Sequence, residues 1–494
     1  MNTRKMIAVC LTLVLALGLP LTVLAQEYDL ANGSVEVTAR DDGRYVTQTN
    51  GVNNEKQTSE TVIKQTGGGS TENTVTIKVE ENKTAEVTLS GVDIDTSNSG
   101  GAAVTTQGKG NVTIELDGSN TVKSGEKHAG VEKNNEGNLT IADQNKDGSL
   151  NATGGKHGAG IGGGGEGAGT DITVSGGKVN ATGGEGGAGI GGGNRGAGSS
   201  ITIENGEVKA TGGESGAGIG GGNQGAGSGI TVKNGTVNAT GGKYSAGIGG
   251  GNLGDGTNIT VNNGEVKATG GDGGAGIGGG AEGSGSEIAV SGDAQVTVQG
   301  GKVGIGAGTG AGIGSGGKWK QNGEELSMDP DRLKEGTIRY YAPGANMQTN
   351  APTKILYNTK AEHNWDGGQV TTPATCTKPG VRTYTCQTNP AHTKTQEIPA
   401  LGHQFETYVY NNDATYEADG TETALCAHPG CGVTDTRRAP GTRLYAPVLY
   451  RVTDGSGKDI PCQAEQKESV LTVTVKDAAF AILTGSLRGI GILK

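Results

Sequence analysis

The sequence predicts an all-β protein in which a parallel β-helix is followed by small β modules stabilised through their cysteine and histidine residues. Glycine supplies 97 of the 494 residues, while aromatic residues make up only 3%. A chain of this composition cannot build a thick core of large side chains, but it can stack small residues in a repeat fold. Two periodicities favour the repeat fold: a 29-residue period in the centre and a period near 40 residues toward the C-terminus.

The 29-residue period is kept by three separate sets of apolar residues. The first set lies in strings of the form G/S-A-G-I-G-G-G and consists of Ile161, Ile190, Ile219, Ile248 and Ile277. The second set consists of Ile172, Ile201, Ile230, Ile259 and Ile288, and the third of Val179, Val208, Val237 and Val266. Apolar residues in each segment alternate with polar residues or glycine, as in strands, and glycine-rich turns separate the segments. Each block therefore predicts one turn of a parallel β-helix, with turns stacked ~4.8 Å apart.

Equal spacing places equivalent residues in rows along the helix axis. The isoleucine and valine sets are expected to form internal ladders, while Asn194, Asn223 and Asn252 are expected to share hydrogen bonds at one corner. Less regular strand patterns precede the repeat, so the β-helix is expected to occupy residues 86–318. Residues 26–85 are expected to form an N-terminal β cap, because the end of a solenoid exposes unpaired strands.

The blocks A-T-G-G-x-x-G-A-G-I-G-G-G resemble repeat domains in large secreted and surface proteins of Gram-positive bacteria, often from the gut. The resemblance covers roughly residues 26–317. It implies a right-handed β-helix and a carbohydrate-binding or adhesin-like role. It does not point to particular ligand-binding residues, which are left unassigned.

The first 25 residues are expected to be a signal peptide. Arg4 and Lys5 precede an apolar run, and the small residue Ala25 suits cleavage by signal peptidase. Its removal changes the formal net charge from −11 to −13, because the segment carries two basic residues and no acidic one. This acidity argues against a nucleic-acid or anionic-membrane partner. No later stretch is apolar enough to span a membrane, so we expect an extracellular protein, free or associated with the cell wall.

A second repeat lies beyond a linker expected at residues 319–362. His363, Cys376, Cys386 and His392 in module 1 (363–402) are matched about 40 residues later in module 2 (403–440) by His403, Tyr416, Cys426 and Cys431. These modules resemble short G-H, A-T-C and Y-T-C-x-x-C repeats found in tandem near the C-terminus of Gram-positive surface proteins. Residues 441–494 are expected to form a small C-terminal β domain.

The cysteine and histidine residues of the modules allow three interpretations. Module 1 supplies two cysteines and two histidines, a full tetrahedral set for structural zinc. A disulfide between Cys376 and Cys386 is the alternative for an exported protein, and free thiols are the third. Module 2 has tyrosine at one cysteine position, which leaves His403, Cys426 and Cys431 as candidate ligands, with His428 as a replacement. Five cysteines remain after export, so at least one lacks an intramolecular disulfide partner, and Cys462 is the best candidate.

No catalytic residues are expected. A polysaccharide-degrading β-helix needs clustered carboxylates, whereas the outward positions of the regular blocks carry mixed charges such as Glu207 and Lys209. Tyr244 is the only aromatic residue between residues 154 and 317, so a sugar site would depend on repeated polar rows. The sequence therefore favours a non-catalytic protein that binds a polysaccharide or a cell-wall or host glycan. A structural stalk is the alternative, and a lyase or hydrolase is a minor one.

Overall fold

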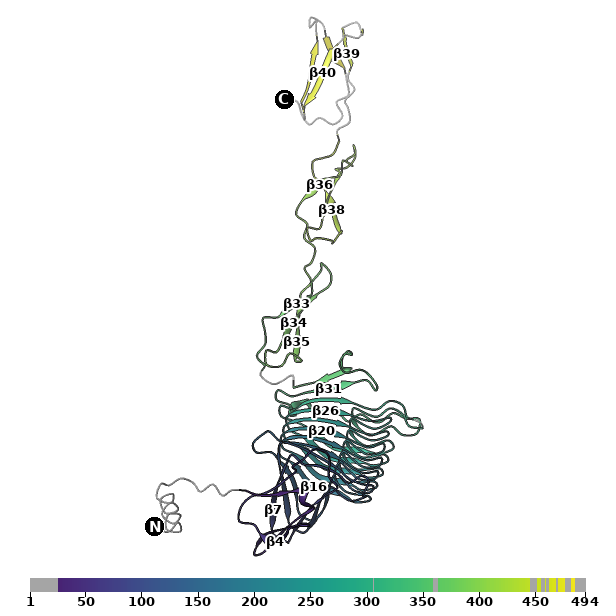
Figure 1. Ribbon diagram of the computed structural model, residues 1–494. Helices are drawn as coiled ribbons and strands as arrows, with labels where there is room; N and C mark the ends of the chain where they lie inside the picture. The colour runs from purple at the N-terminus through teal and green to yellow at the C-terminus, as the bar shows by residue number, and fades with distance from the viewer. Residues whose placement is uncertain are drawn as a thin grey trace, which may run out of the picture. The chain divides into compact units, whose positions relative to one another are not determined.

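A computed structural model describes residues 25–304, 306–358 and 363–444, and beyond them 451–454, 458, 462–467, 470–475 and 481–484 (Figure 1). The contacts divide the chain into two compact units. Unit 1 comprises Met1–Asn364 and Cys386–His392, and unit 2 comprises Trp365–Thr385 and Thr393–Lys494. The expected signal peptide lies outside the described residues except for Ala25.

Unit 1 is a solenoid of three sheets that run side by side along one axis. Sheet 1 contains β1 (Gln26–Asp29), β5 (Thr61–Lys64), β7 (Thr84–Ser90), β10 (Asn111–Asp117), β13 (Leu139–Ala142), β16 (Gly169–Val174), β19 (Gly198–Ile203), β22 (Gly227–Val232), β25 (Gly256–Val261) and β28 (Gly285–Val290). Sheet 2 contains β8 (Asp93–Asp95), β11 (Ser119–Lys123), β14 (Ser149–Thr153), β17 (Lys178–Thr182), β20 (Glu207–Thr211), β23 (Thr236–Thr240), β26 (Glu265–Thr269), β29 (Gln295–Gln299), β31 (Thr337–Tyr341) and β32 (Lys354–Leu356). Sheet 3 contains β4 (Val52–Lys56), β3 (Gly43–Gln48), β2 (Val35–Arg40), β6 (Val75–Val79), β9 (Val104–Gly108), β12 (Val131–Asn135), β15 (Ile161–Gly162), β18 (Ile190–Gly191), β21 (Ile219–Gly220), β24 (Ile248–Gly249), β27 (Ile277–Gly278) and β30 (Ile313–Gly314). Two short 3-10 helices, η1 (Leu30–Asn32) and η2 (Pro330–Arg332), complete the unit.

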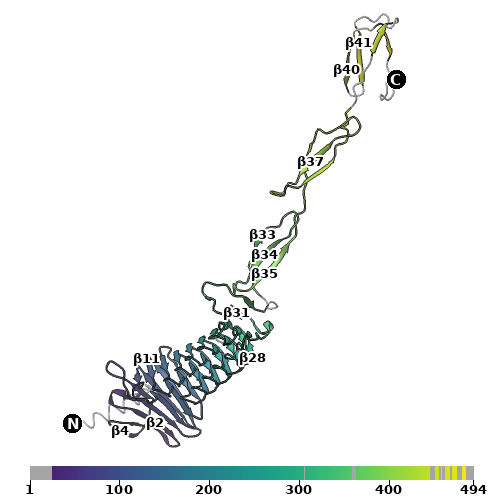
Figure 2. The ribbon, with the colours of Figure 1, turned by 90° about the vertical axis from the view of Figure 1, so that its right-hand side faces the viewer.

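The pairing register confirms that one 29-residue block makes one turn. Ile190 pairs with Ile219 in sheet 3, Ile230 with Ile259 in sheet 1 and Val208 with Val237 in sheet 2, all in parallel. Figure 2 shows these turns stacked along the axis toward β28. The paired residues point inward and are at most 1% exposed, so the core is a set of continuous aliphatic ladders whose burial drives folding.

The glycine after each isoleucine of sheet 3 makes the narrow corner possible. Gly191, Gly220 and Gly249 have φ of +134°, +133° and +132°, a conformation that side chains with a Cβ rarely adopt. A Cβ at these positions would also lie only 2.0–2.1 Å from a carbonyl oxygen of the next turn. The glycine-rich composition is therefore a requirement of close stacking between turns, in addition to the freedom that it gives to corners.

The solenoid begins earlier than the sequence pattern indicates, so the N-terminal boundary expected at residue 86 is wrong. β1 pairs in parallel with β5, and β2 pairs in parallel with β6, so residues 26–85 form the first strands of sheets 1 and 3, while sheet 2 begins at β8. Only β3 and β4 pair in antiparallel fashion, at the edge of sheet 3. These strands cover the exposed first turn, which is the role expected of a cap.

Residues 319–358 likewise close the solenoid and do not form a linker. β31 pairs in parallel with β29, and β32 adds an antiparallel edge strand to it. At the last turn of sheet 3, the Glu325 carboxylate accepts hydrogen bonds from the backbone N–H groups of Gly312 and Ile313, both at 2.8 Å. In the preceding turn the equivalent N–H groups, on Gly276 and Ile277, donate to carbonyls of the next turn. Glu325 therefore takes the place of a further turn.

Replacing Glu325 by alanine is expected to destabilise the C-terminal end of the solenoid by about 1–3 kcal/mol, because two backbone donors lose their acceptors. Urea unfolding of the mature chain, monitored by far-ultraviolet circular dichroism, measures this loss. The neighbouring change Glu324→Ala is the control, since Glu325 and not Glu324 accepts these two hydrogen bonds. Equal stability of the two variants would show that water replaces the carboxylate without cost.

Unit 2 contains small antiparallel sheets. β33 (Gln369–Thr372), β34 (Gly380–Thr385) and β35 (Thr393–Ile398) form the sheet of module 1, and β36 (Tyr408–Tyr410), β37 (Thr421–Leu425) and β38 (Thr434–Arg438) form the sheet of module 2. Beyond them, β39 (Arg451–Asp454) pairs with β42 (Ala481–Thr484), and β40 (Cys462–Lys467) pairs with β41 (Val470–Val475). The side chain of Cys462, the cysteine expected to lack a partner, lies outside the described part of the chain.

Candidate metal centres

The candidate ligands lie in the turns at the ends of the module strands. Cys386 directly follows β34, and His392 directly precedes β35; the Cys386 N–H donates to the His392 carbonyl at 3.0 Å and closes the turn. Cys426 directly follows β37, and its N–H donates to the Val433 carbonyl at 2.9 Å. Each three-stranded sheet thus presents paired ligands on one tight turn.

The first cluster, in unit 2, consists of Cys376, His403, Cys426 and Cys431. Their ligand atoms all lie within 4.8 Å of one another. Cys376 Sγ is 3.8 Å from Cys426 Sγ, and Cys431 Sγ is 3.2 Å from His403 Nδ1. Zn–S bonds of ~2.3 Å in a tetrahedron place two sulfurs ~3.8 Å apart. This cluster could therefore hold a metal ion.

The charges of the first cluster also suit a cation. Contact with the Cys431 thiol and then burial raise the pKa of Cys376 to about 12. Burial also opposes ionisation of Cys426, but hydrogen bonds from backbone groups of Gln404 and His428 outweigh it and lower the pKa of Cys426 to about 5. One thiolate is thus favoured while its neighbour resists ionisation, and a bound cation would favour the thiolate form of both.

His428 lies beside the first cluster as a fifth nitrogen donor. Its Nδ1 is 3.6 Å from Cys376 Sγ and 3.7 Å from Cys426 Sγ. With Ala374, Leu401 and Pro429, it lines a hollow next to the thiols. A tetrahedral ion takes four of these five donors. The ligand nitrogen of His403 lies within 4.8 Å of the three sulfur atoms.

The second cluster, in unit 1, consists of Glu335, His363, Cys386 and His392, with ligand atoms again within 4.8 Å of one another. His363 Nδ1 and His392 Nδ1 are 3.4 Å apart. Zn–N bonds of ~2.0–2.1 Å in a tetrahedron give a separation of ~3.3 Å. His363 Nε2 donates to the Asn358 carbonyl at 2.7 Å, which makes Nδ1 the ring nitrogen that could bind a cation.

His392 is held rigidly in the neutral form that metals require. Its ring is fully buried, stacks on Tyr357 at 4.5 Å and contacts Thr337 Oγ1 through Nε2 at 2.9 Å. Burial, followed by the charge of His363, lowers the pKa of His392. Its Nδ1 lies 3.4 Å from His363 Nδ1, so a cation between the two rings could bind both nitrogens when each carries its proton on Nε2.

The grouping of ligands by module is wrong in one respect. Cys376 does not join His363, Cys386 and His392, because the six-residue strand β34 separates it from Cys386 and holds the two cysteines at opposite ends. The four cysteines whose side chains are described are all free, so the structure does not contain the Cys376–Cys386 disulfide considered as the alternative to zinc. Glu335, which takes the fourth position of the second cluster, was not predicted because it lies in the segment expected to be a linker.

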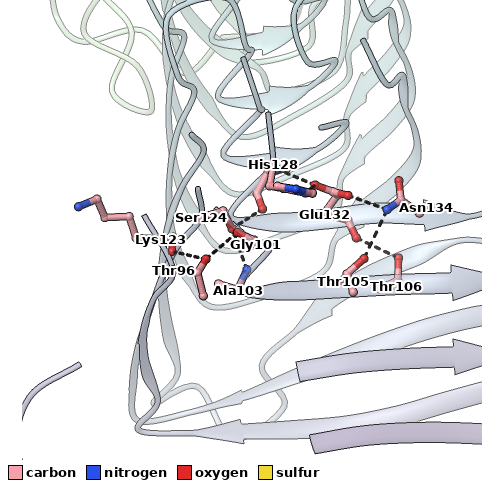
Figure 3. Close-up of polar contacts among 11 residues, drawn as sticks. Thr96, Gly101, Ala103, Thr105, Thr106, Lys123, Ser124, His128, Glu132 and Asn134 are labelled. Carbon is pink, nitrogen blue, oxygen red and sulfur yellow. Dashed lines mark hydrogen bonds and ion pairs between the residues drawn. The ribbon is translucent and has the colours of Figure 1, made fainter. Parts of the chain in front are cut away.

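A buried polar network marks the step from wide to narrow turns (Figure 3). β12 pairs with β9 over five residues but with β15 over only two, which leaves backbone groups without a ladder partner. Glu132 accepts from the Ala129 N–H at 3.1 Å and from Asn134 Nδ2 at 2.7 Å, and it contacts His128 Nδ1 at 2.7 Å. These contacts satisfy the buried polar groups at the step, so we assign the network to the fold.

An acidic hollow on the outside of sheet 1 was not predicted either. It is lined by Glu60, Glu86, Glu115 and Asp117, which the registers of β5, β7 and β10 bring together in the irregular first turns. Neighbours hold three of these carboxylates: Thr88 Oγ1 donates to Glu60 at 2.5 Å, Gln144 N to Glu115 at 2.5 Å and Ser90 Oγ to Asp117 at 2.6 Å. Carboxylates therefore do converge, outside the regular blocks on which the expectation of mixed charge was based.

Comparisons with known proteins address the solenoid. A family model described as beta helix repeat is similar to five segments of the chain, residues 146–165, 172–194, 201–223, 230–252 and 259–281. No curated protein and no solved structure matches the chain. The described residues include no helix with the length and apolar composition needed to cross a membrane. The repeat match and the parallel three-sheet topology agree that this part of the chain is a parallel β-helix built from repeats.

Proposed function

We propose that the protein is an exported, non-catalytic surface or secreted protein that binds a polysaccharide or host glycan through the outer face of sheet 2. This face carries three polar rows that repeat once per turn. The central row consists of Asn151, Asn180, Lys209, Asn238 and Lys267. Amide and ammonium groups at ~4.8 Å intervals can bond sugar hydroxyls repeatedly along a polymer, and many weak contacts then add up.

A specific observation favours a second candidate, a rigid stalk. Several outward charges already pair along the axis with the next turn: Lys178 with Glu207 at 3.3 Å, Lys233 with Glu204 at 2.8 Å and Arg195 with Glu166 at 3.3 Å. These exposed pairs contribute little stability. On sheet 2 itself, the Lys178–Glu207 pair and the bond that Asn180 Nδ2 donates to Asn151 Oδ1 at 2.9 Å compete with a ligand for the outward groups. A continuous β ladder with a self-paired surface suits a spacer.

Binding of the mature full-length chain to a glycan array tests the proposal. We expect binding to neutral polymers that the double variant Asn180→Ala/Asn238→Ala weakens by about tenfold or more, as two lost hydrogen bonds of ~1 kcal/mol each imply. The control is Thr202→Ala/Thr231→Ala, which changes an outward row of sheet 1. Binding lost equally in both variants would contradict a sheet 2 site, and no binding by any form would support the stalk.

The same material tests the absence of catalysis. Release of reducing ends from acidic or neutral polysaccharides, abolished by Glu115→Gln in the acidic hollow, would overturn the non-catalytic assignment. If the control Glu265→Gln, on sheet 2, also abolished the release of reducing ends, the activity would not be specific to the acidic hollow. We expect no turnover with any of these proteins.

Zinc is the metal proposed for the two clusters, in a structural role. Thiolate and imidazole ligands suit zinc, and protein groups fill all four positions, which is typical of structural sites and leaves no open position for a substrate. Neither module buries a core large enough to be stable alone. The metal would therefore supply much of the free energy that keeps each turn folded.

A further inference from the structure

We infer that each metal ion joins one ligand from the end of one repeat to three ligands of the next, so that the ions clasp consecutive repeats together. The inference rests on the proposed zinc sites. It concerns which parts of the chain the ions connect, a property that follows from neither module taken alone.

The two clusters have the same order of ligands along the chain. His403, Cys426 and Cys431 follow His363, Cys386 and His392 by 40, 40 and 39 residues, and Cys376 follows Glu335 by 41. In each cluster two strands separate the first ligand from the other three along the chain. For the first cluster this ligand belongs to module 1, and for the second cluster it belongs to the end of the solenoid segment.

Backbone contacts around the first ligand support the same arrangement. The segment that leads into module 2 lies on the turn that carries Cys376: Leu401 N–H donates to the Thr375 carbonyl at 2.9 Å, and Gly402 N–H donates to the Cys376 carbonyl at 3.0 Å. These bonds place His403 beside the Cys376 thiol. At the second cluster, Asn389 Nδ2 donates to the Glu335 carbonyl at 3.1 Å and serves the same purpose.

The boundary at the end of module 2 has a similar backbone contact but no candidate metal ligands. Tyr416 follows Cys376 by 40 residues, and Arg443 follows His403 by 40. Arg443 Nε donates to the Tyr416 carbonyl at 2.8 Å, and Leu444 N–H donates to the Thr415 carbonyl at 3.0 Å. The residues at the two remaining offsets are Gln466 and Leu471, so the two positions that hold cysteine or histidine in the modules hold neither here. Tyr416 therefore lies at the boundary that follows the two proposed metal sites, and there hydrogen bonds alone connect the two segments.

The experiment combines zinc analysis of the mature full-length chain with alkylation of its thiols, mapped by mass spectrometry. The wild type is expected to hold two zinc ions and to protect Cys376, Cys386, Cys426 and Cys431. In Cys376→Ser we expect Cys386 to stay protected, while Cys426 and Cys431 become more reactive than in the wild type because only His428 is left to take the vacated position. Grouping by module would give the opposite pattern, a reactive Cys386 with Cys426 and Cys431 protected, and would overturn the inference.

Two further variants make the outcome decisive. Glu335→Ala is expected to expose Cys386 alone, whereas Tyr416→Phe is expected to keep both zinc ions and all protection. Loss of zinc in Tyr416→Phe would contradict the assignment of Tyr416 to a metal-free boundary. Absence of zinc from the wild type would instead refute the zinc proposal itself, so the two failures are distinguishable.

Discussion

Replacing Gly220 by alanine is expected to destabilise the solenoid by more than about 4 kcal/mol, the range reached only by severe structural conflicts. The new Cβ would lie 2.0 Å from the Gly249 carbonyl oxygen, and the backbone there has φ of +133°. Moving that carbonyl would break the hydrogen bond it accepts from Gly221 N–H at 2.9 Å. Because Gly191 and Gly278 repeat the contact in the same row, a local shift cannot relieve it without disturbing other turns.

A matched control exists at another glycine with positive φ. Gly229 has φ of +62°, and the equivalent positions of neighbouring turns hold Ser200 and Asn258 with φ of +53° and +52°. Gly229→Asn is therefore expected to change stability by less than about 1 kcal/mol. Urea unfolding and protease resistance of the mature chain measure both variants. If Gly220→Ala were as stable as Gly229→Asn, close stacking of turns would not be what requires the glycine.

Removing zinc is expected to unfold both ligand turns while the solenoid keeps its structure. Structural zinc contributes an apparent free energy of about 10–16 kcal/mol in zinc-finger peptides, far more than the core of either module can supply. The solenoid core consists of aliphatic ladders and needs no metal. Trypsin digestion with a strong chelator should cut at Arg382 and Lys394 in module 1 and at Arg437 in module 2, and added zinc should restore protection.

The solenoid provides the internal control for this experiment. Lys209 and Lys267 lie in β20 and β26 and should stay uncut with or without chelator. Cleavage there, or an unchanged pattern in the modules, would contradict a structural metal confined to the turns.

Acid should have the same effect as the chelator, because metal binding requires deprotonated thiols. The pKa of Cys426 is lowered, to about 5. Its contribution to stability is therefore largest above the ordinary thiol pKa and declines as the pH falls toward about 5. Zinc retained after dialysis across this range measures the decline.

The repeated part of the fold could be predicted from the sequence because its contacts are periodic. Residues 29 apart become neighbours in every turn, so one spacing fixes the ladders of Ile219 and Val237 and the corner of Asn194, Asn223 and Asn252. The asparagine prediction is confirmed: Asn223 Nδ2 donates to Asn194 Oδ1 and Asn252 Nδ2 donates to Asn223 Oδ1, both at 3.2 Å. The row of Gly191, Gly220 and Gly249 follows from the same period. The sequence does not show, however, that the Cα of each of these glycines faces a carbonyl oxygen of the next turn.

Where the period fails, the tertiary structure decides. The first turns of the solenoid have uneven lengths, so only the pairing of β1 with β5 and of β2 with β6 shows that residues 26–85 belong to it. The acidic hollow depends on the same irregular register. Glu325 ends the solenoid through contacts with residues 12 and 13 positions away, which no spacing rule predicts.

The cysteine and histidine residues show most clearly the difference between what the sequence determines and what the tertiary structure decides. The sequence by itself determined which side chains are candidate ligands and that they recur at about 40 residues. It could not determine their grouping, because a spacing along the chain does not show which end of a strand a residue occupies. β34 places Cys376 and Cys386 at opposite ends, and a rigid strand cannot bend to bring them together. The tertiary structure therefore decides which ligands meet and makes each candidate site a junction between consecutive repeats.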